Sequence, residues 1–140
     1  MTEVKYRGNK PEKQRKEDAA YDLRANHEGF IPPGCRALVS TGTQVAVPQG
    51  MAGLVLPRSG LALKNGITVL NAPGLIDPDY VGDVGVILHN TDKHTFYYEQ
   101  GDRIAQLMFV DTPPTKLVKS QKKLASSVRG DSGFGSSGVA

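Results

Sequence analysis

Apolar and polar residues alternate in short runs along the middle of the chain, between Phe30 and Val118. Alternation of this kind is the signature of a β-strand with one buried face. Gly, Pro, Asn and Asp separate the runs and supply turns. A Thr41-Gly42-Thr43 triplet interrupts the first run and predicts a kink there. The pattern therefore predicts strands over residues 36–47, 51–56, 67–70, 84–88, 95–98 and 104–110.

One short segment has the composition of a helix instead. Ser59 can cap a helix start, the residues from Leu61 to Lys64 are helix formers, and Gly66 stands where a helix would end. We therefore expect a single short helix directly after the strand at 51–56.

Evenly spaced short strands with turn signals are typical of an all-β sandwich or jelly roll. The chain shows no internal repeat, and both of its ends are polar. We divide it into a polar basic arm over residues 1–19, a β domain over 20–119, and a Gly/Ser-rich arm over 120–140. The predicted fold class is an all-β, jelly-roll-like sandwich or barrel with one short helix.

The bulk composition fits one ordinary globular domain. The chain has 140 residues, of which 39% are hydrophobic, and one cysteine, Cys35. A single cysteine excludes an intramolecular disulfide and favours a reducing compartment. No apolar run approaches the roughly 20 residues that span a bilayer, and the start lacks the apolar core of a signal peptide. We expect a cytoplasmic protein without a membrane partner.

Positive charge gathers at the two ends of the chain, although the net charge is only +3. The first twenty residues hold six Lys or Arg beside four acids, and residues 116–129 hold five bases and no acid. Such ends could bind nucleic acid through its phosphates. The aromatic residues do not follow this charge as a stacking platform would require. Solvated ends that dock on a partner subunit are therefore favoured, and no specific nucleic acid is expected.

The segment LPRSGLALKNG, residues 56–66, is a candidate anion site. Arg58 offers a charged fork, Ser59 a hydroxyl, and a helix start offers free backbone N–H groups. The same residues also suit a capped surface helix with an isolated arginine. Taken alone, they favour this second interpretation.

The segment VLNAPGLIDPDYVGDVGV, residues 69–86, predicts a hairpin with a tight turn at its Asn-Ala-Pro-Gly sequence. The mouth of a hairpin presents backbone donors and acceptors, and the amide of Asn71 can both donate and accept. Asp77 lies between Ile76 and Pro78, where partial shielding from water would suit a general base. Asp and Pro are also common turn formers, so the spacing alone does not decide.

Other candidates are weak when taken singly. Asp22 stands at the start of the folded region, and Arg103 and Gln106 flank a strand that is predicted to be buried. The three histidines have no metal-ligand spacing, and Cys35 has no evident partner for nucleophilic catalysis. The glycines, serines and arginine of residues 129–138 could become ordered around a phosphate.

Together, five ordered segments resemble the trimeric dUTP pyrophosphatase (dUTPase) family, the enzymes that hydrolyse dUTP. Several ordered motifs are far more specific than any single one. The resemblance runs from Ala20 to the C-terminus. The matching segments are AYDL (20–23), PRSGLA (57–62), Asn71 with GLID (74–77) and YVG (80–82), GDRIAQ (101–106), and RG with GFGSSG (129–130 and 133–138).

The resemblance implies dUTP diphosphatase activity, which yields dUMP and pyrophosphate, keeps uracil out of DNA and supplies dUMP for dTMP synthesis. Asp77 would deprotonate the water that attacks the α-phosphorus, and Tyr80 would pack beneath the deoxyribose. Asn71 and the hairpin backbone would recognise uracil, and Phe134 of a closing C-terminal lid would stack over it. Arg103 would support the site. The implied substrate-binding residues are Arg58, Ser59, Gly60, Asn71, Gly74, Ile76, Tyr80, Gln106, Arg129, Phe134, Gly135, Ser136 and Ser137.

The resemblance also implies Mg²⁺ on the triphosphate, reached by Asp22 through water, and a homotrimer. Each active site would draw motifs from three chains, with the C-terminal segment crossing to a neighbour. The polar stretch over residues 6–18 departs from the more apolar first strand that is usual in the family.

Three alternative functions remain at this point. A dCTP deaminase would share the fold and the triphosphate site, but it would need a catalytic glutamate. A dUTP-binding sensor would control a regulatory protein partner, which the sequence does not identify. A nucleic-acid-binding module would use the basic ends.

Overall fold

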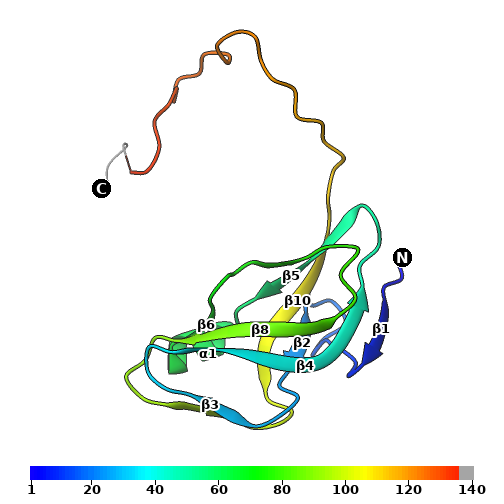
Figure 1. The fold of residues 1–140 in the computed structure, drawn as a ribbon, viewed down its shortest axis with the longest axis vertical. Helices are drawn as coiled ribbons and strands as arrows, with labels where there is room; N and C mark the ends of the chain where they lie inside the picture. Colours follow the sequence, from blue (N-terminus) through cyan, green and yellow to red (C-terminus); the bar gives the residue numbers. More distant parts are fainter. Residues whose placement is uncertain (136–140) are drawn as a thin grey trace.

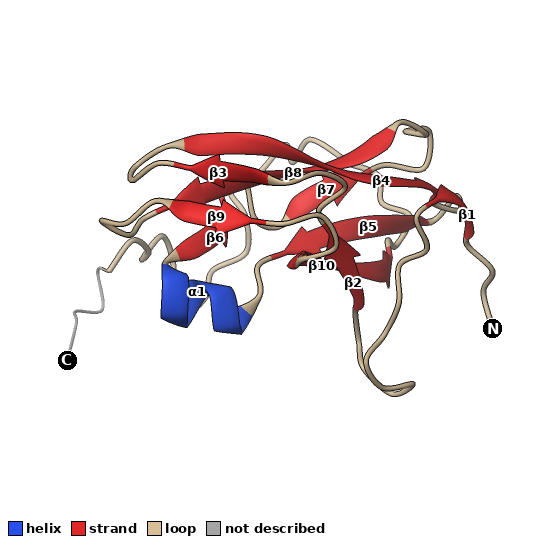
Figure 2. Cartoon of the chain, turned by 90° about the horizontal axis from the view of Figure 1, so that it is seen from below, coloured by secondary structure: helices blue, strands red, loops and turns tan. Residues whose placement is uncertain are grey.

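The computed structural model describes residues 1–135 and consists mainly of two four-stranded sheets packed face to face (Figure 1; Figure 2). All strand pairs are antiparallel, with orders β1-β4-β8-β6 and β2-β10-β5-β7, and β3 pairs with β9 in a small third sheet. The predicted all-β fold class with one short helix is confirmed. The elements are β1 Lys5–Gly8, β2 Tyr21–Arg24, β3 Gly29–Ile31, β4 Arg36–Ala46, β5 Met51–Leu56, α1 Ser59–Asn65, β6 Ile67–Val69, β7 Gly74–Ile76, β8 Asp83–Asn90, β9 Phe96–Tyr98 and β10 Arg103–Asp111.

The long β4–β8 pair forms the centre of the first sheet. Alternate β4 residues point inward, so Val39, Thr41 and Val45 are buried, and the register shifts between Ser40 and Gln44. The hydroxyl of Thr41 donates to the carbonyl of Val84 at 2.6 Å, which satisfies a buried polar group at the irregularity. The predicted kink around residues 41–43 is therefore confirmed.

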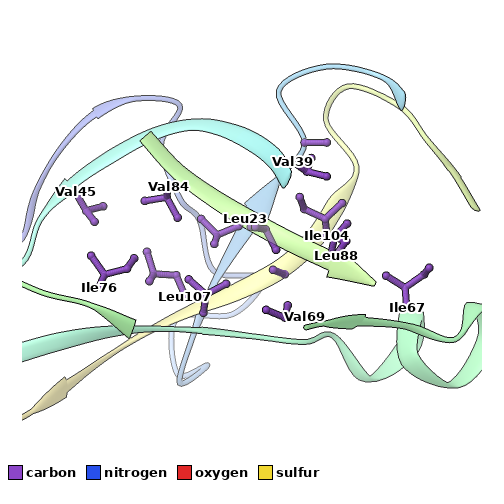
Figure 3. Close-up of a cluster of buried hydrophobic side chains, with 14 of the residues drawn as sticks. Leu23, Val39, Val45, Ile67, Val69, Ile76, Val84, Leu88, Ile104 and Leu107 are labelled. Carbon is purple, nitrogen blue, oxygen red and sulfur yellow. The ribbon is translucent and has the colours of Figure 1, made fainter. Parts of the chain in front are cut away.

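The core lies between the two sheets and draws on both of them (Figure 3). Period-two alternation places one set of side chains from each strand in this layer. The largest fully buried apolar side chains are Leu23, Ile31, Ile67, Val84, Val86, Leu88, Ile104 and Leu107.

The hairpin predicted over residues 69–86 is wrong in its pairing. β6 pairs with β8 in the first sheet, whereas β7 pairs with β5 in the second. The turn between them therefore carries the chain from one layer of the sandwich to the other. Each short strand finds its partner through burial against the core, which the local sequence pattern does not specify.

The helix is confirmed over Ser59–Asn65, and Gly66 ends it in the left-handed conformation, with φ of 64°. The prediction that Ser59 caps the helix is wrong. Arg58 occupies the N-cap position in an extended conformation, and no side chain caps the helix start. Ser59 is already helical, so its hydroxyl is displaced from the geometry of a cap.

The two ends of the chain differ in structure. The polar N-terminal arm contributes β1, whose Lys5 lies opposite Ala46 at the edge of the first sheet. After β10, the N–H of Thr112 donates to the carbonyl of Gly50 at 2.8 Å, and the exposed chain then runs away from the body (Figure 1). Residues 112–135 contain no helix or strand. Across residues 1–135, no helix has the length and apolar character required to cross a membrane.

The core position of Leu107 supplies a test of this packing. Leu107→Ala should lower the free energy of unfolding by roughly 2–5 kcal/mol, because the side chain is fully buried and its loss leaves a cavity. Leu63→Ala on α1 is the matched control: that leucine is 87% exposed, and Ala is a good helix former. Urea unfolding at one protein concentration measures both changes. Equal effects would contradict the assigned core.

Candidate functional site

Three neighbouring strands place polar residues in one row at an end of the second sheet. Gln106 on β10 lies opposite Leu56 on β5 and opposite Asp22 on β2. Arg58 follows β5 by two residues and Arg103 begins β10, so both guanidinium groups belong to the same region. The sheet register thus brings together four residues that are dispersed over the sequence.

Hydrogen bonds and charges hold this row in place. Arg58 Nη1 donates to the Arg103 carbonyl at 2.8 Å, and Gln106 Nε2 donates to the Pro57 carbonyl at 3.0 Å. Arg103 Nη1 lies 3.9 Å from Asp22 Oδ2. Partial burial, and next the nearby charge of Arg103, lower the pKa of Arg58 from its ordinary value. Arginine remains protonated in proteins, so the row presents concentrated positive charge that suits an anion.

A hollow of about 180 Å³ opens beside β7 and is lined mainly by residues of β7, β8 and their connecting loops. It brings together the predicted Asn71, Gly74, Ile76 and Tyr80. Of the strands within residues 1–135, only β5 pairs with β7, so the other edge of β7 leaves backbone donors and acceptors unpaired. A flat polar ring could enter the hollow and hydrogen-bond to this strand edge.

Tyr80 is fixed at the rim of this hollow by its loop. Its hydroxyl donates to the Asp83 carbonyl at 2.5 Å, and its N–H donates to the Asp77 carbonyl at 3.2 Å. Gly82 lies against the ring, since a Cβ at residue 82 would stand 2.7 Å from Tyr80 Oη. The loop therefore requires glycine at this position to keep the ring where it is.

Asp77 directly follows β7, and its side chain is exposed. The shielding expected from Ile76 and Pro78 is therefore absent in the single chain. The reason is the strand geometry: Ile76 points into the core, and Asp77, one residue later, projects to the opposite side.

The polar row and Asp77 lie at opposite ends of β5. Ile76 is opposite Gly53, and Arg58 lies five residues beyond Gly53, roughly 16 Å along an extended chain. Because β7 runs antiparallel to β5, Asp77 is one residue farther away from Arg58. One chain alone therefore does not bring Asp77 and Arg58 together.

The C-terminal candidates lie away from both groups. Arg129 is exposed and donates through Nε to the Ser132 carbonyl at 2.7 Å, within its own turn. Phe134 is fully exposed, and Gly135 follows it at the end of the part that the structure describes. Ser136 and Ser137, also predicted as binding residues, lie outside the described residues.

Sequence reasoning missed one contact at the polar row. Gln14 Nε2 donates to Asp22 Oδ2 at 2.8 Å. A single glutamine within a charged arm carries no periodicity or motif, so no signal in the sequence pointed to it. Within residues 1–135, no cluster of three His, Cys, Asp or Glu residues could hold a metal ion.

Comparisons with known proteins agree over nearly the whole chain. A family model described as dUTPase matches residues 7–138. The deoxyuridine 5'-triphosphate nucleotidohydrolase of Tropheryma whipplei (strain Twist) is 46% identical over 138 residues, which cover 97% of this chain and 94% of that protein. The enzyme of the same name from Chlamydia pneumoniae is 47% identical over 134 residues, covering 94% of this chain and 92% of that one.

Solved structures give the same match in three dimensions. A structure of Staphylococcus bacteriophage 80alpha dUTPase with dUPNHPP has a TM-score of 0.89 and 27% sequence identity to this chain. The match covers 99% of this chain and 100% of that chain.

The close approach of Gly82 to Tyr80 can be tested directly. Gly82→Ala should push the ring out of its position, because the new methyl group would overlap with Oη, and the hydrogen bond to Asp83 should be lost. A crystal structure of the variant would show the displacement. Gly60→Ala is the control, since a Cβ there meets nothing within 4 Å. An unmoved Tyr80 in the variant would contradict the account of this loop.

Proposed function

The chain belongs to the dUTPase family, and we propose from the geometry of its site how it hydrolyses dUTP to dUMP and pyrophosphate. The observation that carries the proposal is the pair of groups just described: a base-sized hollow lined by β7, the strand that Asp77 follows, and the polar row with its two arginines. We place the reaction in the cytoplasm, where a free, exposed thiol such as Cys35 stays reduced.

In this proposal the hollow beside β7 binds the deoxyuridine. The free edge of β7 and the Asn71 amide present the donors and acceptors that uracil requires, and we assign the exclusion of the methyl group of thymine to the wall of the same hollow. Gly74 contributes its backbone to the wall of the hollow, and Ile76 forms the floor of the hollow. Tyr80, held by its bond to Asp83, packs beneath the deoxyribose and excludes a 2′-hydroxyl.

The polar row binds the phosphates, chiefly through Arg58 and Gln106. Arg58 uses one N–H on the Arg103 carbonyl and keeps others of its five donors for phosphate oxygens. The backbone N–H groups of Ser59 and Gly60 lie in the first turn of α1, where helices leave them without an intrahelical partner. Gln106 completes the set as a neutral donor.

Asp77 acts as the general base. Its carboxylate accepts a proton from a water molecule as the water oxygen bonds to the α-phosphorus. The bond from this phosphorus to the bridging oxygen breaks, so pyrophosphate departs and dUMP remains. The exposure of Asp77 in the single chain leaves its carboxylate open to a neighbouring chain and to the closing C-terminal lid.

The residues present fit Mg²⁺ that is held mainly by the triphosphate. Asp22 is one carboxylate with a side chain 12% exposed, and Mg²⁺ commonly keeps several waters while using one or two carboxylates. We assign Asp22 as the residue that accepts hydrogen bonds from those waters. When bound, the ion offsets negative charge on the phosphates.

We propose that each active site is built from three chains of a homotrimer. The separation of Asp77 from Arg58 supports this assembly, because a second chain must bring the two groups together. The outer face of the second sheet also carries an apolar row across three strands, in which Leu54 lies opposite both Leu75 and Met108. Leu75 is 64% exposed in the single chain, so burial against another copy would stabilise the assembly.

The general base can be tested by Asp77→Asn. Its rate of dUTP hydrolysis should fall by roughly 10²- to 10⁴-fold, since Asn cannot accept the proton, while binding of a non-hydrolysable imido analogue persists. Asp79→Asn is the matched control, because Asp79 is also exposed and lies two residues later. Equal losses in the two variants would contradict the assignment of Asp77.

The same assay distinguishes the alternative functions. Hydrolysis is measured with dUTP, dCTP, dTTP and UTP side by side in the presence of Mg²⁺. Pyrophosphate and dUMP from dUTP alone are the expected products. Ammonia released from dCTP would identify a deaminase, and tight dUTP binding without turnover would identify a sensor.

The C-terminal lid leads to a separate prediction. Removal of the chain from Arg129 onward should abolish most dUTP hydrolysis and leave the unfolding midpoint nearly unchanged, because the removed residues that the structure describes make no contact with the core. Activity assays and thermal unfolding of the truncated chain measure the two effects. Full activity after truncation would contradict the lid.

Mixing two inactive chains then tests whether sites are shared. The truncated chain retains Asp77, and the full-length Asp77→Asn chain retains the lid. Co-refolded in equal amounts, they should recover about a quarter of wild-type activity, because random assembly unites the two intact parts in that share of sites. Mixing without refolding is the control. No recovery after co-refolding would show that Asp77 and the lid of one site come from the same chain.

A further inference from the structure

The N-terminal arm contacts Asp22 and its neighbour Tyr21 at the start of β2. Glu12 forms a bridge with Asp22, whose N–H donates to the Glu12 carbonyl at 2.7 Å. Lys13 Nζ lies 4.8 Å from the ring centre of Tyr21. Gln14 Nε2 then donates to Asp22 Oδ2 at 2.8 Å. Three consecutive arm residues thus contact the two residues at the start of β2.

These contacts engage only one oxygen of the carboxylate. Oδ2 accepts the bond from Gln14 and lies 3.9 Å from Arg103 Nη1. Among residues 1–135, no hydrogen bond is present at Oδ1 of Asp22. A carboxylate oxygen has lone pairs for two donors, so Oδ1 is the one available to an incoming group.

A neutral amide suits this position for an electrostatic reason. Gln14 orients the carboxylate and leaves its negative charge intact, whereas a lysine or arginine in direct contact would neutralise it. Arg103 and the more distant Arg58 already place positive charge near this acid. Another cation in direct contact would weaken the attraction between Asp22 and a divalent ion.

We propose that Gln14 is a positioning residue for the Mg²⁺-dependent part of nucleotide binding. It fixes Oδ2 of Asp22 so that Oδ1 accepts hydrogen bonds from the water shell of the ion. The inference rests on the proposed role of Asp22 and adds a residue outside the five segments that resemble the family. It also gives the polar N-terminal arm a function at the active site.

The test compares Gln14→Met with Lys16→Met. Met preserves the length of the glutamine side chain and removes its donor; Lys16 is an exposed residue of the same loop. Calorimetry measures the affinity for the imido analogue of dUTP with Mg²⁺ and with EDTA. The readout is the ratio of the affinity with Mg²⁺ to the affinity with EDTA, which we call the Mg²⁺ factor. General electrostatic effects of a variant change both affinities and cancel in this ratio.

In Gln14→Met this factor should fall by roughly tenfold, the lower end of the loss seen when a partner of a metal ligand is removed. The affinity in EDTA should stay within about twofold of wild type, and Lys16→Met should keep the full factor. Gln14→Asn should resemble Gln14→Met, because its shorter side chain does not reach Asp22. It provides a second variant if Gln14→Met fails to fold.

An unchanged Mg²⁺ factor in Gln14→Met would overturn the role of Gln14. If binding were weakened equally with Mg²⁺ and with EDTA, the result would assign Gln14 to the general structure of the arm. Asp22→Asn separates this failure from failure of the proposed function. If Asp22→Asn keeps the wild-type Mg²⁺ factor, the assignment of Asp22 itself is wrong.

Discussion

The pairing of β5 with both β7 and β10 is the constraint on which the rest of the molecule depends. Gly53 on β5 permits this packing, because a Cβ there would stand 3.2 Å from Ile76 and 3.4 Å from Leu107. Val55 on the same strand is buried in the core. The strand therefore fixes the hollow beside β7, the polar row beyond Leu56, and the distance between them.

In the proposed homotrimer, this rigidity divides the active site between chains. A strand pair in a packed sandwich has no freedom to bend Asp77 toward Arg58, since the side chains of Ile76 and Leu107 lock its register. A second chain can supply the missing half at no conformational cost to the first. Formation of the site then depends on the surface that joins the chains, and the apolar row of Leu54, Leu75 and Met108 is suited to that purpose.

Local patterning predicted most of the fold, because a strand with one buried face shows alternating apolar and polar residues in the sequence. The kink at residues 41–43 and the end of α1 at Gly66 were also predictable, since glycine marks both. β1 was not, because all four of its residues are exposed and no alternation arises. The partners of β6 and β7 were missed for another reason: pairing across a sandwich depends on contacts distant in sequence.

The candidate site was predictable as a set of residues but not as an arrangement. Motifs identified Asp22, Arg58 and Asp77, yet the register alone shows that the first two share a row and the third lies apart.

The contact of Gln14 with Asp22 shows the limit of motif reasoning most clearly. Nothing about one glutamine in a charged arm distinguishes it, and its partner lies eight residues away across an irregular loop. The contact exists because β1 anchors the arm to the edge of the first sheet, while the bridge at Glu12 returns the chain to β2. Backbone pairing thereby holds against Asp22 a segment whose composition suggests a solvated end, and composition alone does not predict that pairing.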